Sequence, residues 1–591
     1  MNFANDCVIP AFERLKLKPR PGQIEVCVKI LDAFVNKEKK NVILSAPTGS
    51  GKSIIGMVIA ECITHMINFE GVVNSSIMLT ATNLLADQYS TTFDEIADRL
   101  KDTKEEPIEF LTLKGANNYE CTANDEQDSV VPVTAENCSF YDMTRAKQCE
   151  FDDIINNHCK TCVYRTTKAR KNMARHVTTN YAMYFVDRLY IKGPTGFSDR
   201  DLIVWDEAHL LNDIFSEHLS IYFSQKIANE IRDDFKKYIR LTDIRIGKNL
   251  KILIDAIAKK GAINETNFTE YLDLMSSVYL YARDAAKSEE ADARSSGNKK
   301  MANAYNRLAR KYEGRFCKID DFNKFQWPRV FDAAETEASF SVKPIFVGRM
   351  FKELQASEFN LFLSATLSDT FLTTTLELDT EETEYIKMAS VFPVENKKVI
   401  FFNPRSLNYQ KMQEKQTIEK LVKDVSQIVQ KHSKLGERGI VLAPSFAVVE
   451  SLRDALGECD TEVFEHQRGQ RGQDILREFK SWTGGPAVLV SPSMYEGVDL
   501  PGDLSRYQII IKAPYPSLAD KRIKYILDNY PAIYNIQTLM KIVQGAGRSV
   551  RSPEDYAVTY ILDSNAQRLF FGKENSWRDE FAVFVEKGEL K

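Results

Sequence analysis

A glycine-rich segment early in the chain has the residue types and spacing of a phosphate-binding loop: Ala46-Pro47-Thr48-Gly49-Ser50-Gly51-Lys52-Ser53. Its glycines allow successive backbone N–H groups to point into one cavity, where they hold phosphate oxygens. Lys52 is the candidate partner of the terminal phosphates and Ser53 the candidate Mg²⁺ ligand. Ala46 stands where the general pattern has glycine. The candidate ATP-binding residues of the loop are Thr48, Gly49, Gly51, Lys52 and Ser53.

Two acidic residues follow a second apolar stretch, Leu202-Ile203-Val204-Trp205. Asp206 is the candidate for coordinating Mg²⁺, directly or through water, and Glu207 for orienting and deprotonating an attacking water. Acids at this place also suit a plain helix N-terminus. The phosphate-loop pattern upstream favours the catalytic interpretation, and we expect His209 to connect the site to a second sheet.

A third segment can supply positive charge, which phosphoryl transfer needs in its transition state. Gln544-Gly545-Ala546-Gly547-Arg548-Ser549-Val550-Arg551 contains two arginines about one helical turn apart, so on a helix they share a face. Arg548 and Arg551 are the candidate arginine fingers, and Gln544 is a further candidate catalytic residue. The alternative is a pair of solvated arginines with no catalytic role.

Half of the chain's 10 cysteines lie between the glycine-rich loop and the acidic pair: Cys121, Cys138, Cys149, Cys159 and Cys162. No N-terminal signal pattern and no bilayer-spanning apolar stretch is present, so we expect a cytoplasmic protein with no membrane partner. In reducing surroundings clustered cysteines indicate zinc or iron–sulfur ligands. Only one tight pair, Cys159 and Cys162, is present. Because structural zinc sites usually have two such pairs, the spacing favours iron–sulfur.

The elements that must position these residues follow an α/β pattern. Apolar segments separated by helical periodicity indicate a parallel sheet covered on both faces, with a helix over residues 53–67. The predicted strands of this first sheet lie at 41–45, 76–80, 202–205 and 361–363. A second α/β pattern begins near Lys398, with predicted strands at 439–444, 487–491, 508–512 and 557–562. Two sheets of similar plan fit a duplicated motor core.

Two segments depart from this α/β pattern. Residues 212–341 are polar, helix-periodic and poor in strand signals, which predicts a helical insert. Within them, residues 283–300 are charged and suit either an exposed helix or a mobile segment. A basic run of Arg165, Lys168, Arg170, Lys171 and Arg175 follows Cys162. It suits phosphate contacts, with Tyr164 stacking on a base, or else a solvated helix.

The order of these motifs resembles that of the superfamily 2 helicases of the XPD/DinG group, over nearly the whole chain. Arg20-Pro21-Gly22-Gln23 resembles the segment that contacts adenine, which makes Gln23 a candidate cofactor-binding residue. Thr80-Ala81-Thr82, with Leu85 and Gln88, resembles the first DNA-contact motif. Further matching segments are Lys114-Gly115, Asn118-Tyr119-Glu120-Cys121, Val177 to Tyr181, Lys343-Pro344, Ser364 to Leu367, Ser491 to Leu500 and Lys512 to Pro516.

The resemblance implies an ATP-dependent DNA helicase that moves 5′ to 3′ on single-stranded DNA and unwinds forked or tailed duplexes, as a monomeric motor connected with DNA repair. ATP, Mg²⁺ and a 4Fe–4S cluster held by four cysteines are the implied cofactors. Cys121 and Cys162 match the cluster pattern best, and Cys138 and Cys149 are preferred to Cys159 for the remaining places. Protein partners stay unknown.

The implied architecture is two RecA-like parallel-sheet motor domains with two insertions. Motor domain 1 comprises residues 1–115, 177–212 and 342–396, interrupted by an iron–sulfur domain at 116–176 and a helical arch domain at 213–341. Motor domain 2 comprises residues 397–591.

Other functions remain open from the residues alone. The net charge of −5 argues against a globally basic nucleic-acid binder, although a local basic groove is sufficient for binding. An RNA-directed superfamily 2 ATPase would use the same motor core. An ATP-switched DNA-binding scaffold would show ATPase activity that DNA fails to stimulate, and a zinc-bearing ATPase would be colourless.

Overall fold

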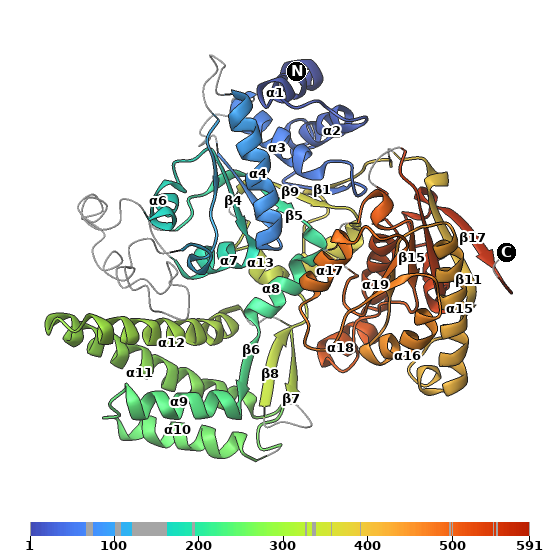
Figure 1. Ribbon diagram of the computed structural model, residues 1–591. Helices are drawn as coiled ribbons and strands as arrows, with labels where there is room; N and C mark the ends of the chain where they lie inside the picture. The colour runs from blue at the N-terminus through green and yellow to red at the C-terminus, as the bar shows by residue number, and fades with distance from the viewer. Residues whose placement is uncertain are drawn as a thin grey trace.

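The computed structural model describes residues 2–66, 75–100, 108–120, 162–191, 196–259, 261–325, 328–333, 339–355, 357–390, 392–495, 498, 500–547, 549–550 and 554–589. These residues contain two seven-stranded sheets and one three-stranded sheet. Figure 1 shows the two large sheets side by side, with a group of helices below them. Among the described helices, none is both long and apolar enough to cross a lipid bilayer.

The first sheet has the strand order β10-β1-β9-β5-β2-β4-β3, and every neighbouring pair is parallel. β1 and β5 are buried along their whole length. Both faces of a parallel sheet are covered, so its strands are continuous apolar segments. The strands are β1 (Asn41–Ser45), β2 (Ser76–Thr80), β3 (Phe110–Thr112), β4 (His176–Asn180), β5 (Arg200–Asp206), β9 (Ser357–Ser364) and β10 (Thr383–Lys387).

Successive side chains of these strands enter two different cores, because they point to opposite faces of the sheet. Ile203 and Trp205 belong to a core that includes α7 and α8, whereas Leu202 and Val204 belong to a core that includes α1, α2 and α3. The helices of this part are α1 (Ile9–Arg14), α2 (Gln23–Val35), α3 (Lys52–Glu61), α4 (Asn83–Leu100), α6 (Val163–Arg170), α7 (Tyr181–Tyr190), α8 (Leu211–Leu219), α13 (Gly348–Phe351) and α14 (Asp369–Leu376). Two π-helical turns, Ala4–Val8 and Cys62–Met66, extend α1 and α3.

The second sheet repeats this plan, with the all-parallel order β13-β14-β12-β15-β16-β11-β17. Its strands are β11 (Lys397–Arg405), β12 (Gly439–Leu442), β13 (Glu462–Glu465), β14 (Ala487–Ser491), β15 (Tyr507–Ile510), β16 (Ala557–Asp563) and β17 (Ala582–Glu586). The accompanying helices are α15 (Lys415–Lys434), α16 (Phe446–Gly457), α17 (Gly472–Ser481), α18 (Lys521–Asn529), α19 (Pro531–Ala546) and α20 (Ser564–Phe570). The predicted α/β fold with two parallel motor sheets is therefore confirmed.

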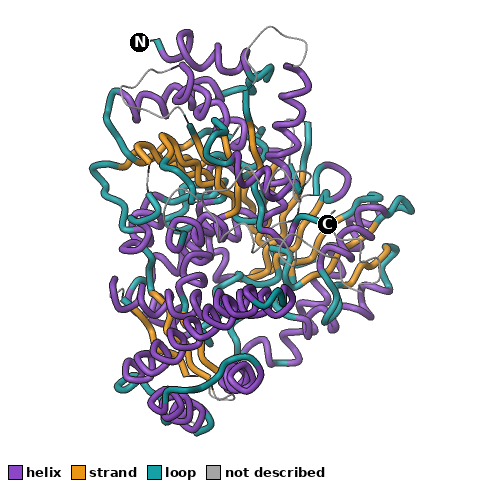
Figure 2. Tube along the Cα trace, turned by 90° about the vertical axis from the view of Figure 1, so that its left-hand side faces the viewer, coloured by secondary structure: helices purple, strands orange, loops and turns teal. Residues whose placement is uncertain are grey.

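The insert between α8 and β9 combines four helices with a small antiparallel sheet of order β6-β8-β7. Its elements are β6 (Ile221–Ser224), α9 (Gln225–Lys237), α10 (Ile244–Ile257), α11 (Phe268–Ser295), α12 (Lys299–Phe325), β7 (Arg329–Ala333) and β8 (Ser339–Pro344). Figure 1 and the view turned by 90° in Figure 2 both place this insert below the two motor sheets.

The insert confirms one sequence prediction, a helix within residues 283–300, and contains strands that were not predicted. Residues 283–300 are helical up to Ser295 and again from Lys299, so the exposed-helix interpretation was right. The three strands were missed. β6 has only four residues, and it lies far along the chain from its partner β8, so neither strand makes a long local apolar pattern.

Two groups of contacts hold the motor sheets together. Near the glycine-rich loop, the indole N–H of Trp577 donates to Ser45 Oγ over 3.2 Å, and Lys387 Nζ lies 3.4 Å from Glu580 Oε1. Further along, Asp213 of α8 accepts hydrogen bonds from Arg522 over 3.1 Å and from Gln537 over 2.7 Å.

Candidate nucleotide-binding and catalytic site

The glycine-rich loop joins the carboxyl end of β1 to the first turn of α3. Gly49 and Gly51 have φ angles of 81° and 80°, in the left-handed region that glycine adopts without steric cost. Gly51 is the residue immediately before α3, which begins at Lys52. The loop thus turns its N–H groups and the positive end of α3 toward the same space, the arrangement that binds phosphate.

Gln23 lies beneath this loop. Its amide nitrogen donates to the Ser50 carbonyl over 2.8 Å, and its amide oxygen accepts from the Arg20 backbone N–H over 2.8 Å. The Arg20 guanidinium donates to the Gly49 carbonyl over 2.6 Å. A Cβ at Gly51 would lie 2.5 Å from the Gln23 amide nitrogen, so glycine is required there for close packing as well. In this structure both ends of the Gln23 amide brace the loop.

The acidic pair lies at the carboxyl end of β5, facing the loop. Glu207 has φ 54° and ψ 45°, a left-handed conformation that costs a non-glycine residue about 1–3 kcal/mol. Its backbone N–H donates to Asp206 Oδ1 over 3.0 Å. Backbone strain of this kind is typical of functional sites, where the surrounding structure holds a side chain in one direction.

Lys52 interacts electrostatically with both carboxylates. Burial, followed by the Glu207 charge, raises the pKa of Asp206, and Lys52 partly opposes this rise. Burial also disfavours the charged form of Glu207, but Lys52 and hydrogen bonds from His209 and Ser364 keep its pKa below the ordinary value. The pair therefore contains one strongly acidic carboxyl and one carboxyl that a cation would help to ionise.

His209 connects Glu207 to the second motor sheet. Its Nδ1 atom lies 3.3 Å from Glu207 Oε2 and 2.8 Å from Ser364 Oγ, and Ser364 also donates to Glu207 over 3.1 Å. The amide nitrogen of Gln544, on α19, lies 2.9 Å from His209 Nε2 and donates to Thr366 Oγ1 over 2.9 Å. Because the Gln544 amide is a donor, we assign the ring proton of His209 to Nδ1. The expected link between the two sheets is present.

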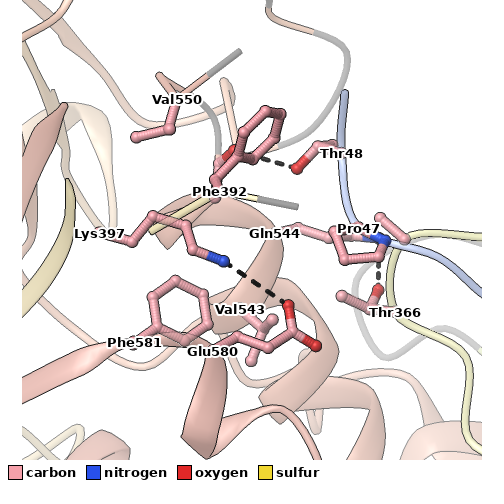
Figure 3. Close-up of a pocket in the computed structure, with 12 residues that line it drawn as sticks. Pro47, Thr48, Thr366, Phe392, Lys397, Val543, Gln544, Val550, Glu580 and Phe581 are labelled. Atoms are coloured by element: carbon pink, nitrogen blue, oxygen red, sulfur yellow. Dashed lines mark hydrogen bonds and ion pairs between the residues drawn. The ribbon is translucent and has the colours of Figure 1, made fainter. Parts of the chain in front are cut away.

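A cleft with about 360 Å³ of empty space, open solvent included, lies between the loop and the second motor sheet. Figure 3 shows Thr48 and Gln544 on one side and the ion pair of Lys397 with Glu580 on the other. The Thr48 hydroxyl donates to the Gly547 carbonyl over 3.0 Å, which joins the loop to the predicted arginine segment.

Two buried polar atoms at this site have no hydrogen-bond partner among the described residues, the Ser50 hydroxyl and the Gln544 amide oxygen. Buried polar groups are usually satisfied, so such atoms indicate a missing ligand or water. The donor set fits a magnesium nucleotide: Ser53 and Asp206 provide oxygen ligands, which Mg²⁺ prefers, and the loop provides N–H groups for phosphate.

The tertiary structure thus brings together five of the predicted site residues: Lys52, Ser53, Asp206, Glu207 and Gln544. Arg548 and Arg551 lie outside the described residues. Of their described neighbours, Gly547 accepts a hydrogen bond from Thr48 over 3.0 Å, and the buried Ser549 hydroxyl accepts one from Gln508 over 2.7 Å.

Four of the five candidate metal ligands, Cys121, Cys138, Cys149 and Cys159, lie outside the described residues. Cys162 is half-buried and directly precedes α6. The rings of Tyr119 and Tyr164 pack with centroids 5.3 Å apart, so the chain leaves and re-enters the motor domain at neighbouring points. Within the described ranges, no group of three or more His, Cys, Asp or Glu side chains is placed to hold a metal ion.

Part of the basic run has a structural role that differs from the one expected. Tyr164 is only 4% exposed and packs in the core, so it cannot stack on a nucleic-acid base. Lys171 is buried, donates to Asp187 over 2.7 Å and lies 4.0 Å from the Phe197 ring centroid. Arg170 pairs with Glu109 over 2.5 Å. The prediction that Tyr164 and Lys171 contact DNA is therefore wrong, because α6 and the residue that follows it place these side chains in the interior.

Sequence reasoning missed two tyrosines at the acidic pair. The Tyr89 hydroxyl donates to Asp206 Oδ2 over 3.1 Å, and the Tyr181 hydroxyl donates to the Asp206 carbonyl over 2.7 Å. Both side chains are buried in the apolar cores. In a helical pattern such residues count as core positions, so nothing local in the sequence signals their second role.

Two family models match different parts of the chain. The model described as type III restriction enzyme, res subunit, matches residues 16–242, and the model described as helicase C-terminal domain matches residues 426–575. The first range contains Lys52 and Asp206, and the second contains Gln544. The two matches therefore fall on opposite sides of the cleft.

Curated relatives match nearly the whole chain. The ATP-dependent DNA helicase YoaA of Escherichia coli (strain K12) is 23% identical, over 94% of this chain and 92% of the relative. A probable ATP-dependent helicase of Methanocaldococcus jannaschii is 21% identical, over 92% of this chain and 91% of the relative.

Solved structures share the fold over a similar extent. An XPD helicase aligns with a TM-score of 0.59 at 15% identity, covering 97% of this chain and 100% of that chain. Xpd4 of S. tokodaii aligns with a TM-score of 0.57 at 16% identity, covering 96% of this chain and 100% of that chain.

Proposed function

We propose that this chain, which has the fold and motif order of the XPD/DinG-like superfamily 2 helicases, uses ATP hydrolysis to move along single-stranded DNA and to separate duplex strands. The family resemblance rests on the two family models, on relatives that match along nearly the full length, and on the shared fold. Relatives named as ATP-dependent DNA helicases support this activity.

One observation carries the proposal: the line of side chains from Glu207 through His209 to Gln544. Glu207 and Gln544 belong to different motor sheets, and His209 and Gln544 are 335 residues apart in sequence. A hydrolytic carboxylate that is connected to a helix of the other sheet can respond to a change in the relative position of the two sheets. This connection is what an ATPase needs if its chemistry is to be coupled to movement between domains.

We assign the residues of this site as follows. Lys52 pairs with the terminal phosphates, while Thr48, Gly49 and Gly51 shape the loop around them and Gln23 braces it. Ser53 and Asp206 would hold Mg²⁺, which when bound supplies positive charge against the phosphate oxygens. Glu207 orients and deprotonates the attacking water. Arg548 and Arg551 are the proposed arginine fingers, offered by the segment that Gly547 anchors at the loop.

The cycle follows from the placement of these groups on two domains. With ATP in the cleft, Lys52 binds it from one sheet and the arginine segment from the other, so the sheets are drawn together. Hydrolysis removes that bridge and lets the sheets part. If the two sheets hold the DNA strand unequally in the two states, each cycle moves the strand in one direction.

The metal-bearing insert is the second part of the proposal. A 4Fe–4S cluster would be held by Cys121, Cys162 and two of Cys138, Cys149 and Cys159, and would fold a small domain that separates the strands. The Tyr119 and Tyr164 rings, which flank the cysteine-rich segment in sequence, have centroids 5.3 Å apart, and this supports the proposal that an insertion begins and ends there. We propose a 5′-to-3′ direction from the resemblance.

The domain bounds are also a proposal, with one adjustment from the elements. The expected arch boundary at residue 213 falls inside α8. Phe215 of α8 packs against Phe185 of α7 with ring centroids 4.5 Å apart, so α8 belongs with motor domain 1. The arch domain then runs from β6 to β8.

The direct test is strand displacement after anaerobic purification with iron analysis. We expect brown protein that unwinds 5′-tailed but not 3′-tailed duplex DNA, and only with ATP. Unwinding from the 3′ tail alone would contradict the proposed direction, and zinc without iron would contradict the cluster. ATPase activity that RNA stimulates and DNA does not would favour the RNA-directed alternative, while ATPase that neither stimulates would favour a scaffold.

A further inference from the structure

Tyr89 occupies a position that its place in the sequence does not reveal. It lies on α4, is 2% exposed, and its hydroxyl donates to Asp206 Oδ2 over 3.1 Å. Burial and the neighbouring Asp206 charge raise the pKa of Tyr89 well above the ordinary value. The hydroxyl therefore keeps its proton and acts as a donor to the carboxylate.

Ser53 is a second polar neighbour of the same hydroxyl. A phenol has one proton and two lone pairs, so the oxygen that donates to Asp206 can still accept from Ser53. Tyr89 thus stands between the two side chains that the loop and the acidic pair contribute as oxygen ligands for Mg²⁺.

This placement suits the requirements of a hydroxyl ligand. Ser53 can turn a lone pair to a cation only if its proton points elsewhere, and the Tyr89 oxygen provides an acceptor for that proton. Asp206 receives one hydrogen bond on each oxygen, from Tyr89 on Oδ2 and from the Glu207 N–H on Oδ1. Each oxygen of a carboxylate has two lone pairs, so one on each remains available.

The surroundings keep the Tyr89 ring in place. It lies in the core formed by α3, α4 and the β-sheet, with the Phe93 ring centroid 6.0 Å away. Gly56 of α3 lies beside it: a Cβ there would be in ordinary contact with the Tyr89 hydroxyl at 3.9 Å and tight, at 3.2 Å, against Val204 Cγ1 and Leu363 Cδ1. A fixed ring makes the hydroxyl a fixed point from which both ligands are oriented.

We propose that Tyr89 is a positioning residue for the Mg²⁺ of the nucleotide, acting through its hydrogen bond to Asp206 and as an acceptor for the proton of the neighbouring Ser53 hydroxyl. The role deepens the proposed ATPase function and rests on it. Partners that hold a metal ligand from behind typically contribute about 10- to 100-fold to metal affinity. Tyr89 touches neither nucleotide nor metal in this role, so its loss should change the Mg²⁺ requirement more than nucleotide binding itself.

The test titrates Mg²⁺ against the binding of a fluorescent, non-hydrolysable ATP analogue, with wild type and Tyr89→Phe compared. Tyr89→Phe keeps the ring and removes one oxygen, and the thermal midpoint without nucleotide checks its fold. We expect it to need about 10- to 100-fold more Mg²⁺, with unchanged analogue affinity in the absence of Mg²⁺. Tyr184→Phe is the matched control, because that buried hydroxyl donates to the Leu354 carbonyl over 2.9 Å, away from the acidic pair.

A double-mutant cycle with Ser53→Ala gives the second measurement. If Tyr89 acts partly through Ser53, the fold-loss of Mg²⁺ affinity in the double variant is smaller than the product of the fold-losses in the two single variants. Equal Mg²⁺ midpoints for wild type and Tyr89→Phe would overturn the positioning role alone. So would an equal loss of analogue affinity with and without Mg²⁺, which indicates general damage to the core. A wild-type chain whose analogue binding ignores Mg²⁺ would overturn the proposed ATPase function, and the role of Tyr89 with it.

Discussion

The amide of Gln544 connects the second motor sheet through His209 to Glu207, the proposed catalytic carboxylate, and its replacement by methionine is the sharpest test of coupling. Methionine has a similar length and no donor. The substitution removes the hydrogen bonds to His209 and Thr366, each 2.9 Å long. His209 then loses the partner that holds its ring proton on Nδ1, the side facing Glu207 and Ser364.

The expected magnitude follows from the number of bonds lost. A neutral hydrogen bond contributes about 0.5–1.5 kcal/mol net, so two contribute about 1–3 kcal/mol. If this energy couples the sheets in the transition state, kcat falls about 5- to 150-fold. An interaction made only in the transition state lowers kcat and kcat/KM by the same factor, with KM unchanged.

The assay is steady-state ATPase with saturating single-stranded DNA, followed by strand displacement. Gln537→Met is the matched control: it lies on the same helix and also bridges the sheets, with a 2.7 Å bond to Asp213, but does not contact the Glu207 line. We expect Gln537→Met to retain kcat. Wild-type kcat in Gln544→Met, or equal losses in both variants, would refute the idea that this line couples the sheets.

Four further outcomes are expected. Lys52→Ala removes ATPase and unwinding but spares nucleotide-free DNA binding, in contrast to the exposed control Lys29→Ala; retained ATPase would contradict the site. Cys121→Ser, assayed by strand displacement and phosphate release, abolishes unwinding while some ATP hydrolysis remains, and full unwinding by cluster-free protein would refute the wedge. Trp577→Ala removes a buried indole between the sheets and lowers the free energy of unfolding by about 3–5 kcal/mol. The first unfolding transition should then have its midpoint at a lower urea concentration. Burial lowers the pKa of His176, so below about pH 6.5 the unfolded chain takes up this proton more readily than the folded chain. The free energy of unfolding therefore decreases as the pH is lowered, by up to about 1.4 kcal/mol per pH unit. Equal pH profiles of stability for wild type and His176→Gln would contradict this.

Much of the motor core could be predicted from local pattern. The predicted strands at 41–45, 76–80 and 487–491 coincide with β1, β2 and β14. The helix after the loop begins one residue earlier than predicted, at Lys52. The resemblance to the XPD/DinG group and the two-sheet fold are confirmed. Buried parallel strands and a glycine-rich turn are legible because their residues are close in sequence.

Contacts between elements that lie far apart in the sequence could not be predicted from local pattern. The Gln23 amide braces the loop through Ser50 and Arg20, a role that its motif did not indicate, while its contact with the nucleotide stays a prediction. Tyr164 was expected to stack on a base, but α6 turns it into the core. In both cases the residue type was compatible with either role, and only the packing of its helix decided which atoms it meets.

By itself, the sequence determined that a phosphate loop, an acidic pair and a glutamine–arginine segment occur in this order on two α/β units, because each depends on spacing within a single turn or strand. Only the tertiary structure decided that Gln544 meets His209 and that Tyr89 stands behind Asp206. Hydrogen bonds act over about 3 Å, so a partner far along the chain is set by how helices and sheets dock, which no local pattern encodes.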